Sequence, residues 1–116
     1  MTTDSRLITI TPIKQSGLPT QIAIPVALQE LEDGCDRGSS CVFRILTVED
    51  GDKRIVWNAN RLIEIRDAAK LFNDCVAAGM VPYRIGKDGK PAGTMNEFDP
   101  TAEEVLFAPL SLAAAG

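Results

Sequence analysis

Residues 41–79 read CVFRILTVEDGDKRIVWNANRLIEIRDAAKLFNDCVAAG, and the rest of the chain is arranged around this stretch. Two apolar runs flank Asp50-Gly51, a dipeptide typical of the two-residue type I′ turn, in which both central residues need positive φ. Apolar residues with helical spacing follow the second run directly. The stretch therefore predicts a β-hairpin that leads into one long helix.

A turn at Asp50-Gly51 also sets the predicted register of the hairpin. Counting outward from that turn gives the cross-strand pairs Val48–Lys53, Leu46–Ile55 and Arg44–Trp57 on one face, and Thr47–Arg54, Ile45–Val56 and Phe43–Asn58 on the other. Both faces are then apolar near the middle, whereas a half-exposed hairpin alternates apolar and polar residues. We expect the helix to cover one face, and residues 1–40 or another subunit to cover the second.

The helix is predicted from apolar residues that recur three and four positions apart. These residues are Leu62, Ile65, Ala69, Phe72 and Val76, with Ile63, Ala68 and Cys75 beside them. We expect the helix to form the main core with the hairpin through contacts of Ile65, Phe72 and Val76 with Ile45 and Val56. Asn60 or Asn58 is the expected N-cap, and Gly79 is the expected left-handed residue after the last turn.

The segments on either side of this unit predict further strands. Strands are expected at 6–12, 21–27, 80–86 and 103–110, a loop at 32–40, and a long turn at 86–94. A short helix over 25–32 competes with the second strand, and we favour a strand followed by one or two helical turns. The order β-β-β-β-α-β-β predicts an α+β fold, in which a mixed, mostly antiparallel sheet of about five or six strands packs on one long helix.

The chain reads as one domain over residues 1–116, which is long enough to bury a core without disulfides or metals. Residues 1–40 form an N-terminal cover, 41–110 the core, and 111–116 (SLAAAG) an apolar tail. A right-handed crossover makes the strand over 81–85 parallel to the strand over 54–57 if both belong to one sheet.

The order hairpin, helix, strand, strand from Val42 onward resembles the β-grasp layout of ubiquitin-like proteins. The resemblance covers about two-thirds of the chain and rests on element order. It implies a β-grasp sheet, and a ubiquitin-like protein is one alternative for the function. The C-terminal AAAG differs from the diglycine of the conjugated members, so the resemblance does not imply modifier chemistry.

Composition and charge exclude several classes of function. The net charge of −4 argues against nucleic-acid or membrane binding through a general basic surface. The apolar runs are shorter than the roughly 20 residues that cross a bilayer, and the N-terminus lacks the apolar segment of a secretory signal. We therefore expect a protein of the cytoplasm or of an assembled particle. Three cysteines, an odd number, suit a reducing compartment.

The residue types argue against catalysis and metal binding. The chain has no histidine, which removes the commonest general base and most zinc sites. Cys35, Cys41 and Cys75 lack metal-ligand spacing, so we expect buried or incidental thiols. The segment 86–90 (GKDGK) is followed by Pro91 rather than by a helix, so it does not match a phosphate-binding loop. We predict no catalytic residue, no metal and no cofactor.

The remaining candidates are residues for contact with a protein partner. Arg44 opposite Trp57 could form a cation–π pair at an interface, Lys87 and Lys90 make the long turn basic, and the tail offers apolar anchors. The predicted interface residues are Arg44, Trp57, Lys87, Lys90, Leu110 and Leu112. They favour a non-catalytic interaction or assembly module with a protein partner or a second copy, such as an accessory subunit or a structural protein of a virion or mobile element. A small-ligand binder, or an enzyme that uses Asp, Glu, Lys or Cys, is the other alternative.

Overall fold

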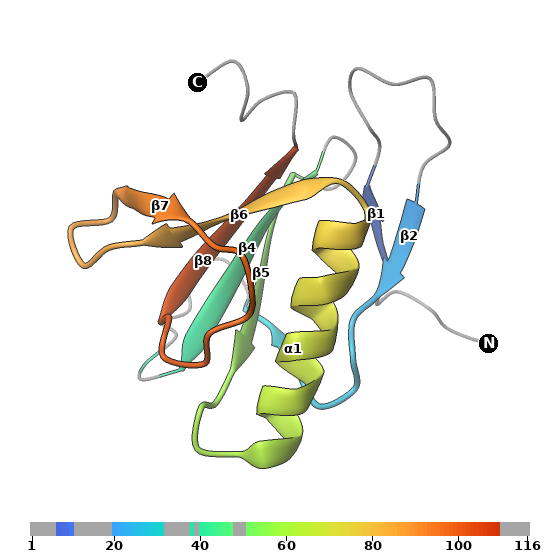
Figure 1. Cartoon of the computed structure of the whole chain (residues 1–116). Coiled ribbons are helices and arrows are strands. Elements are labelled where there is room, and N and C mark those ends of the chain that lie inside the picture. The colour runs from blue at the N-terminus through green and yellow to red at the C-terminus, as the bar shows by residue number, and fades with distance from the viewer. Residues whose placement is uncertain (1–6, 11–19, 32–37, 39, 48–50, 110–116) are drawn as a thin grey trace.

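The computed structural model describes residues 7–10, 20–31, 38, 40–47 and 51–109, and Figure 1 shows their arrangement. They form one helix and eight strands: β1 (Leu7–Ile10), β2 (Thr20–Ala23), β3 (Gln29–Glu30), β4 (Cys41–Thr47), β5 (Gly51–Trp57), α1 (Leu62–Ala77), β6 (Met80–Ile85), β7 (Pro91–Thr94) and β8 (Glu104–Pro109). The predicted α+β fold is confirmed, with one helix packed against a mixed six-stranded sheet.

The six-stranded sheet has the order β3-β5-β4-β8-β6-β7. The first strand of the hairpin and the last strand of the sheet, β4 and β8, lie side by side and parallel at its centre. The other neighbouring strands are antiparallel, so β6 runs in the same direction as β5, as expected for a crossover through α1.

Two short strands, β3 and β7, were not expected from the sequence. The predicted helical turns after Pro25 are wrong, because the Leu28 N–H donates to the Pro25 carbonyl at 3.0 Å and closes a tight turn. This turn directs Gln29–Glu30 onto the edge of β5. The predicted long turn over 86–94 is a hairpin instead, in which β7 pairs with β6.

The register of the β4–β5 hairpin differs from the prediction by three residues. Thr47 pairs with Gly51, so residues 48–50 connect the strands, and Phe43 pairs with Ile55. A shift by an odd number of residues moves the side chains of one strand to the opposite face of the sheet relative to those of the other strand. The observed register gathers the apolar side chains of Cys41, Phe43, Ile45, Ile55 and Trp57 on the face toward α1, whereas the predicted register divides them between both faces.

The helix is rotated relative to the predicted apolar stripe. Its buried residues are Ala68, Leu71, Phe72 and Cys75, with Ile65 partly buried. Val76 is 42% exposed, and Val56 lies on the sheet face away from α1, so the predicted contact between them is wrong. Leu71, which the predicted stripe omits, is fully buried. The buried face of the helix is therefore centred closer to Leu71 than the predicted stripe is. Gly79 has φ +102°, which confirms its left-handed role after the last turn.

Five aromatic side chains form the centre of the core. Phe43 contacts the rings of the other four, Trp57, Phe72, Phe98 and Phe107, at centroid distances of 5.3–6.4 Å. Three of these contacts are edge-to-face and the fourth is tilted, and edge-to-face packing is a geometry that aromatic pairs prefer. Phe98 comes from the segment between β7 and β8, so this connection closes one side of the core.

Hydrogen bonds around Asp99 shape the connection that carries Phe98. The Asp99 carboxylate accepts the amide N–H of Thr101 at 2.9 Å, its hydroxyl at 2.7 Å, and an Arg84 Nη2–H at 2.6 Å. The Thr101 hydroxyl and amide, and then Arg84, lower the pKa of Asp99 to about 2 from 3.8. These bonds fix the chain on either side of Asp99 and place Phe98 over the core.

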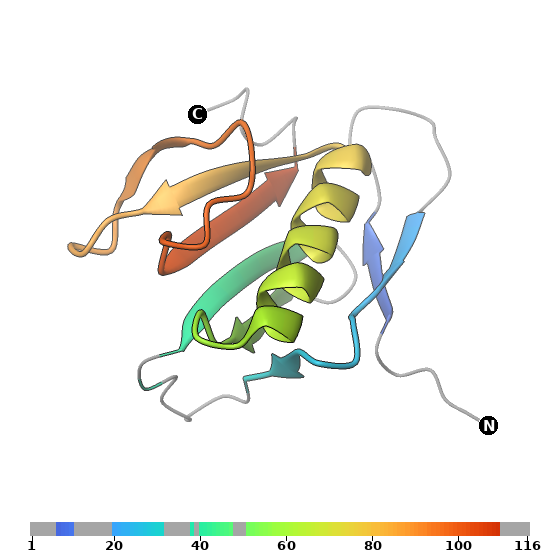
Figure 2. The same ribbon diagram turned by 60° about the horizontal axis from the view of Figure 1, so that its bottom comes forward.

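The β1–β2 ribbon packs beside α1, on the same side of the sheet as the helix (Figures 1 and 2). Ile8, Ile22 and Ile24 from this part of the chain are buried in the same cluster as Phe43 and Phe72. The first forty residues were expected as a cover for the second face of the hairpin. Among those described, the ribbon instead extends the core around the helix.

Candidate interaction surface

The predicted interface anchor Trp57 lies in the core. Its side chain is 1% exposed, and its ring centroid is 5.7 Å from that of Phe43 and 5.4 Å from that of Phe98. Trp57 pairs with Cys41 across the hairpin, whereas Arg44 pairs with Arg54 on the opposite face. The predicted Arg44–Trp57 pair is therefore wrong, and Trp57 stabilises the core.

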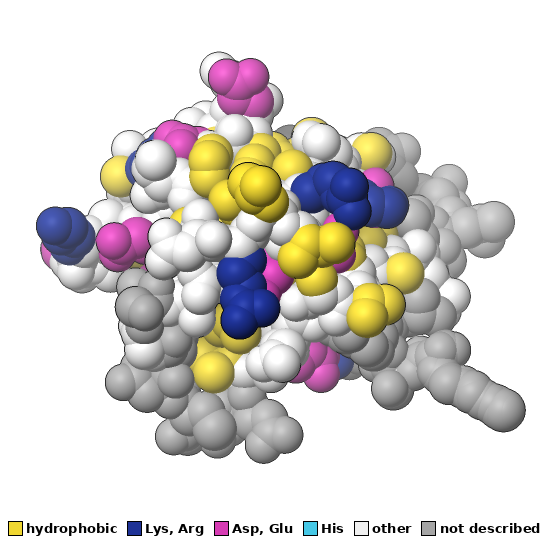
Figure 3. Space-filling model, turned by 90° about the horizontal axis from the view of Figure 1, so that it is seen from below, with side chains coloured by type: hydrophobic (Ala, Val, Ile, Leu, Met, Phe, Trp, Pro, Cys, Tyr) yellow, Lys and Arg dark blue, Asp and Glu magenta, His cyan; other side chains and the backbone are white. Residues whose placement is uncertain are grey.

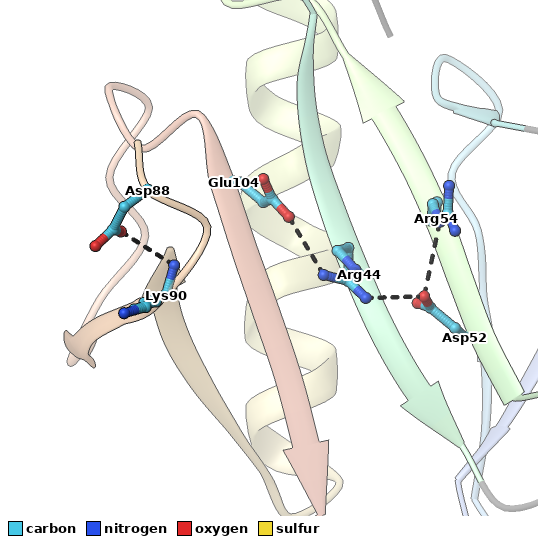
Figure 4. A network of polar contacts seen from close by, with 6 residues as sticks. All are labelled: Arg44, Asp52, Arg54, Asp88, Lys90 and Glu104. Carbon is cyan, nitrogen blue, oxygen red and sulfur yellow. Dashed lines mark hydrogen bonds and ion pairs between the residues drawn. The ribbon is translucent and has the colours of Figure 1, made fainter. Parts of the chain in front are cut away.

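Arg44 lies in a charged network that crosses three strands on the sheet face away from α1 (Figure 4). Its terminal nitrogens are 3.1 Å from the Asp52 carboxylate and 3.5 Å from the Glu104 carboxylate. Arg54 adds a contact of 3.6 Å to Asp52. Partly exposed ion pairs contribute about 0–1 kcal/mol each. The network ties β5, β4 and β8 together, and Arg44 is engaged within its own sheet.

Lys87 and Lys90 are exposed in the turn that joins β6 to β7. The Gly86 N–H donates to the Lys90 carbonyl at 2.8 Å, and the Asp88 carboxylate accepts the Lys90 N–H at 3.1 Å (Figure 4). Gly89, at φ +82°, adopts the left-handed conformation that this turn requires. The turn is thus hydrogen-bonded, and it presents both lysines at the edge of the sheet. The last two candidates, Leu110 and Leu112, lie outside the described residues.

Cys41 and Cys75 are buried, and Cys35 lies outside the described residues. In the part of the chain that the structure describes, no three His, Cys, Asp or Glu side chains lie close enough together to hold a metal ion. Burial raises the pKa of the Cys75 thiol from 9.0 to about 12, and the Asp74 carboxylate adds to the rise. The Cys75 thiol is therefore neutral in the folded protein at physiological pH.

The raised pKa of Cys75 predicts a loss of stability at alkaline pH. The contribution of the protonated thiol to the free energy of unfolding is fully present below pH 9. Between about pH 9 and 12 the unfolded chain loses this proton while the folded chain keeps it. The free energy of unfolding should then fall by about 1.4 kcal/mol per pH unit from this group. Urea unfolding of the wild type and of Cys75→Ala at pH 7, 9, 10 and 11 measures this loss of stability. The variant should show a shallower decline above pH 9, and equal declines would contradict the assignment.

The start of α1 is organised by Glu64 rather than by an asparagine cap. The N-cap residue is Arg61, whose side chain makes no capping hydrogen bond. The Glu64 carboxylate accepts the backbone N–H of Asn58 at 2.8 Å, and the Asn58 side chain accepts the N–H of Asn60 at 2.8 Å. The predicted asparagine cap is therefore wrong. Asn58 closes a turn ahead of the helix, and Glu64 ties that turn to the first helical turn.

Large apolar side chains are exposed beside this turn. Val26, in the turn between β2 and β3, is 88% exposed; Leu62 and Ile63, which begin α1, are 84% and 52% exposed. Figure 3 shows hydrophobic side chains interleaved with basic ones over this end of the molecule. Arg61 and Arg66 are the exposed basic residues of the same segment. We call Val26, Arg61, Leu62, Ile63 and Arg66 the α1 start surface.

An open cleft of about 290 Å³ adjoins the α1 start surface. It is lined by Ala27, Gln29, Ser40, Val56, Trp57, Asn58, Arg61 and Glu64. Because Ala27 follows Val26 and Arg61 precedes Leu62, the cleft joins the two segments that carry the exposed apolar residues. Two further open clefts, of about 330 and 440 Å³, lie beside the β6–β7 turn and along the connection that carries Phe98.

The sequence contained a partial signal for this surface. An apolar stripe drawn through Ala68, Leu71, Phe72 and Cys75 leaves Leu62 more than a quarter turn away from its centre at 100° per residue. The prediction omitted Leu71 and therefore counted Leu62 as a core residue. No comparable signal marks Val26, because its exposure follows from the turn after Pro25.

Comparisons with protein families, curated proteins and solved structures give no significant match. In the described part of the chain, no helix has the length and apolar character needed to cross a membrane.

Proposed function

We propose that the protein is a non-catalytic interaction module that binds another protein through the α1 start surface. The observation that carries this proposal is the near-complete exposure of Val26 and Leu62 beside a cleft. Isolated exposed apolar residues are common, whereas neighbouring ones that line the approach to a cleft are typical of contact sites. Such a module acts as an accessory subunit or as a structural part of an assembled particle.

The exposure of Leu62 is not explained by packing within the described chain. The buried side of α1 consists of Ala68, Leu71, Phe72 and Cys75, and Leu62 points away from it. Full burial of a leucine side chain contributes about 1.5–3 kcal/mol. A partner that covers Leu62 and Val26 together gains this contribution from both residues, and the cleft between their segments can accept one of its side chains.

Introducing charge at these two positions is expected to weaken binding strongly while the fold is retained. The double variant Val26→Asp/Leu62→Asp should lose at least about tenfold in affinity for any partner, including a second copy, because each aspartate loses its hydration on contact. Sedimentation at several concentrations measures self-association. Crosslinking of the purified chain in extract from its source, followed by mass spectrometry, measures capture of other proteins.

Val76→Asp provides the matched control. Val76 is exposed and belongs to the same helix, but it lies near the opposite end of α1, so this variant should keep the complexes of the wild type. Thermal unfolding of each variant checks that the fold is intact. The proposal is contradicted if the folded double variant keeps every complex of the wild type. It is also contradicted if the wild type forms no complex.

A further inference from the structure

We infer that the partner at the α1 start surface is a protein segment that carries acidic side chains next to an apolar side chain. This inference rests on the proposed function and adds the chemistry of the partner. Its basis is two exposed arginines, Arg61 and Arg66, that lie among the exposed apolar residues, in a chain whose net charge is −4.

Both arginines of the surface have guanidinium N–H groups that can still donate hydrogen bonds to a carboxylate. Arg66 is exposed and makes no ion pair with any residue that the structure describes. Arg61 has 68% of its side chain exposed, and its Nε lies 3.7 Å from Glu64. That carboxylate already accepts the Asn58 N–H at 2.8 Å. Two carboxylates lie close to these two guanidinium groups: Glu64 is largely engaged, and Asp67 does not face Arg66, because adjacent residues of a helix point in different directions.

The charged and apolar groups can be contacted at the same time. Leu62 and Ile63 lie four and three positions before Arg66, so the three side chains are neighbours on the helix surface. One turn later, Lys70 pairs with Asp74 at 3.0 Å, so this lysine is engaged within the helix. Arginine binds carboxylates through two parallel hydrogen bonds, which favours Asp or Glu on the partner.

The size and charge of the surface favour a protein segment over a membrane or a nucleic acid. Its apolar part spans one helical turn and one residue of the β2–β3 turn, a small area for insertion into lipid. The net charge of −4 repels anionic bilayers and phosphate backbones. A short acidic segment interacts with the two arginines locally and can seat one apolar side chain beside Leu62.

Three synthetic helical peptides and NMR of the ¹⁵N-labelled full chain test this inference. The first peptide carries Glu and Leu at helical spacing, the second replaces each Glu with Lys, and the third keeps Glu but replaces each Leu with Ser. The first should shift the amide signals of residue 26 and of residues 61–66, and the other two should bind at least about fivefold more weakly. Arg61→Glu/Arg66→Glu should reverse the preference toward the second peptide. Arg61→Gln/Arg66→Gln should remove the preference without reversing it.

The outcomes separate this inference from the proposed function. Equal binding of the first and second peptides overturns the acidic partner but leaves the apolar contact in place. Vesicles of phosphatidylserine and phosphatidylcholine are tested in the same way. If the vesicles shift these signals and the first peptide does not, the acidic protein partner is overturned in favour of a lipid surface. Failure of all three peptides to shift these signals at millimolar concentration overturns this inference, whereas the proposed function is tested separately by the Val26→Asp/Leu62→Asp variant.

Discussion

Replacing Phe72 with alanine is expected to lower the free energy of unfolding by about 3–5 kcal/mol, a large part of the stability of a domain of this size. The side chain is 1% exposed. Its ring centroid lies 6.4 Å from that of Phe43, 5.9 Å from that of Phe98 and 5.5 Å from that of Phe107. The truncation therefore opens a cavity where the helix meets the two central strands. Urea unfolding followed by circular dichroism measures the loss.

Leu62→Ala is the control for this experiment, because it is a truncation in the same helix. Leu62 is 84% exposed, so its replacement should change the free energy of unfolding by no more than about 0.5 kcal/mol. The apolar stripe predicted from sequence places both residues in the core and requires comparable costs. A small cost for Phe72→Ala, or a large one for Leu62→Ala, would contradict the observed rotation of the helix.

Replacing Phe98 with alanine has the second-largest expected effect, a loss of about 2–3 kcal/mol. Phe98 is partly buried, so the cost is lower than for Phe72. Its ring contacts those of Phe43, Trp57 and Phe72 at centroid distances of 6.2, 5.4 and 5.9 Å. It is the residue through which the connection between β7 and β8 closes the aromatic core.

The indole of Trp57 reports this change directly, since it is the single tryptophan of the chain. Loss of the Phe98 ring should admit water beside the indole and shift the fluorescence emission of the folded protein to longer wavelength. Glu97→Ala, an exposed neighbour in the same connection, should leave the emission unchanged. An unshifted spectrum of folded Phe98→Ala would show that Phe98 does not cover Trp57.

Much of the fold was predictable from local patterns. The β-branched and apolar runs of the hairpin, the helical spacing after Asn60 and the left-handed Gly79 each depend on short stretches of sequence, and they gave the order hairpin, helix, strand, strand. That order was sufficient to expect an α+β fold with one helix packed against a mixed sheet. Two short strands were missed because β3 and β7 have little intrinsic strand character and form by pairing with β5 and β6.

The candidate surface was predicted much less well. Trp57 and Arg44 were paired because the Asp50-Gly51 signal favours a two-residue turn, whereas the strands are joined by three residues. Turn preference is a local effect of modest size. The observed register buries four large side chains on one face and leaves Arg44, Asp52 and Arg54 to pair on the other. Burial of that area outweighs the preference of a single turn.

The amino-acid sequence alone determined the long helix and where it ends, the longer strands, and that the chain is acidic without a histidine. Backbone preferences and apolar periodicity act within a few residues, so they can be read from the sequence directly. Only the tertiary structure decided the register of the hairpin, the rotation of α1 and therefore which apolar residues remain exposed. These depend on how the aromatic side chains of the helix, the sheet and the Phe98 connection fill a common core, because close packing selects one orientation of each element.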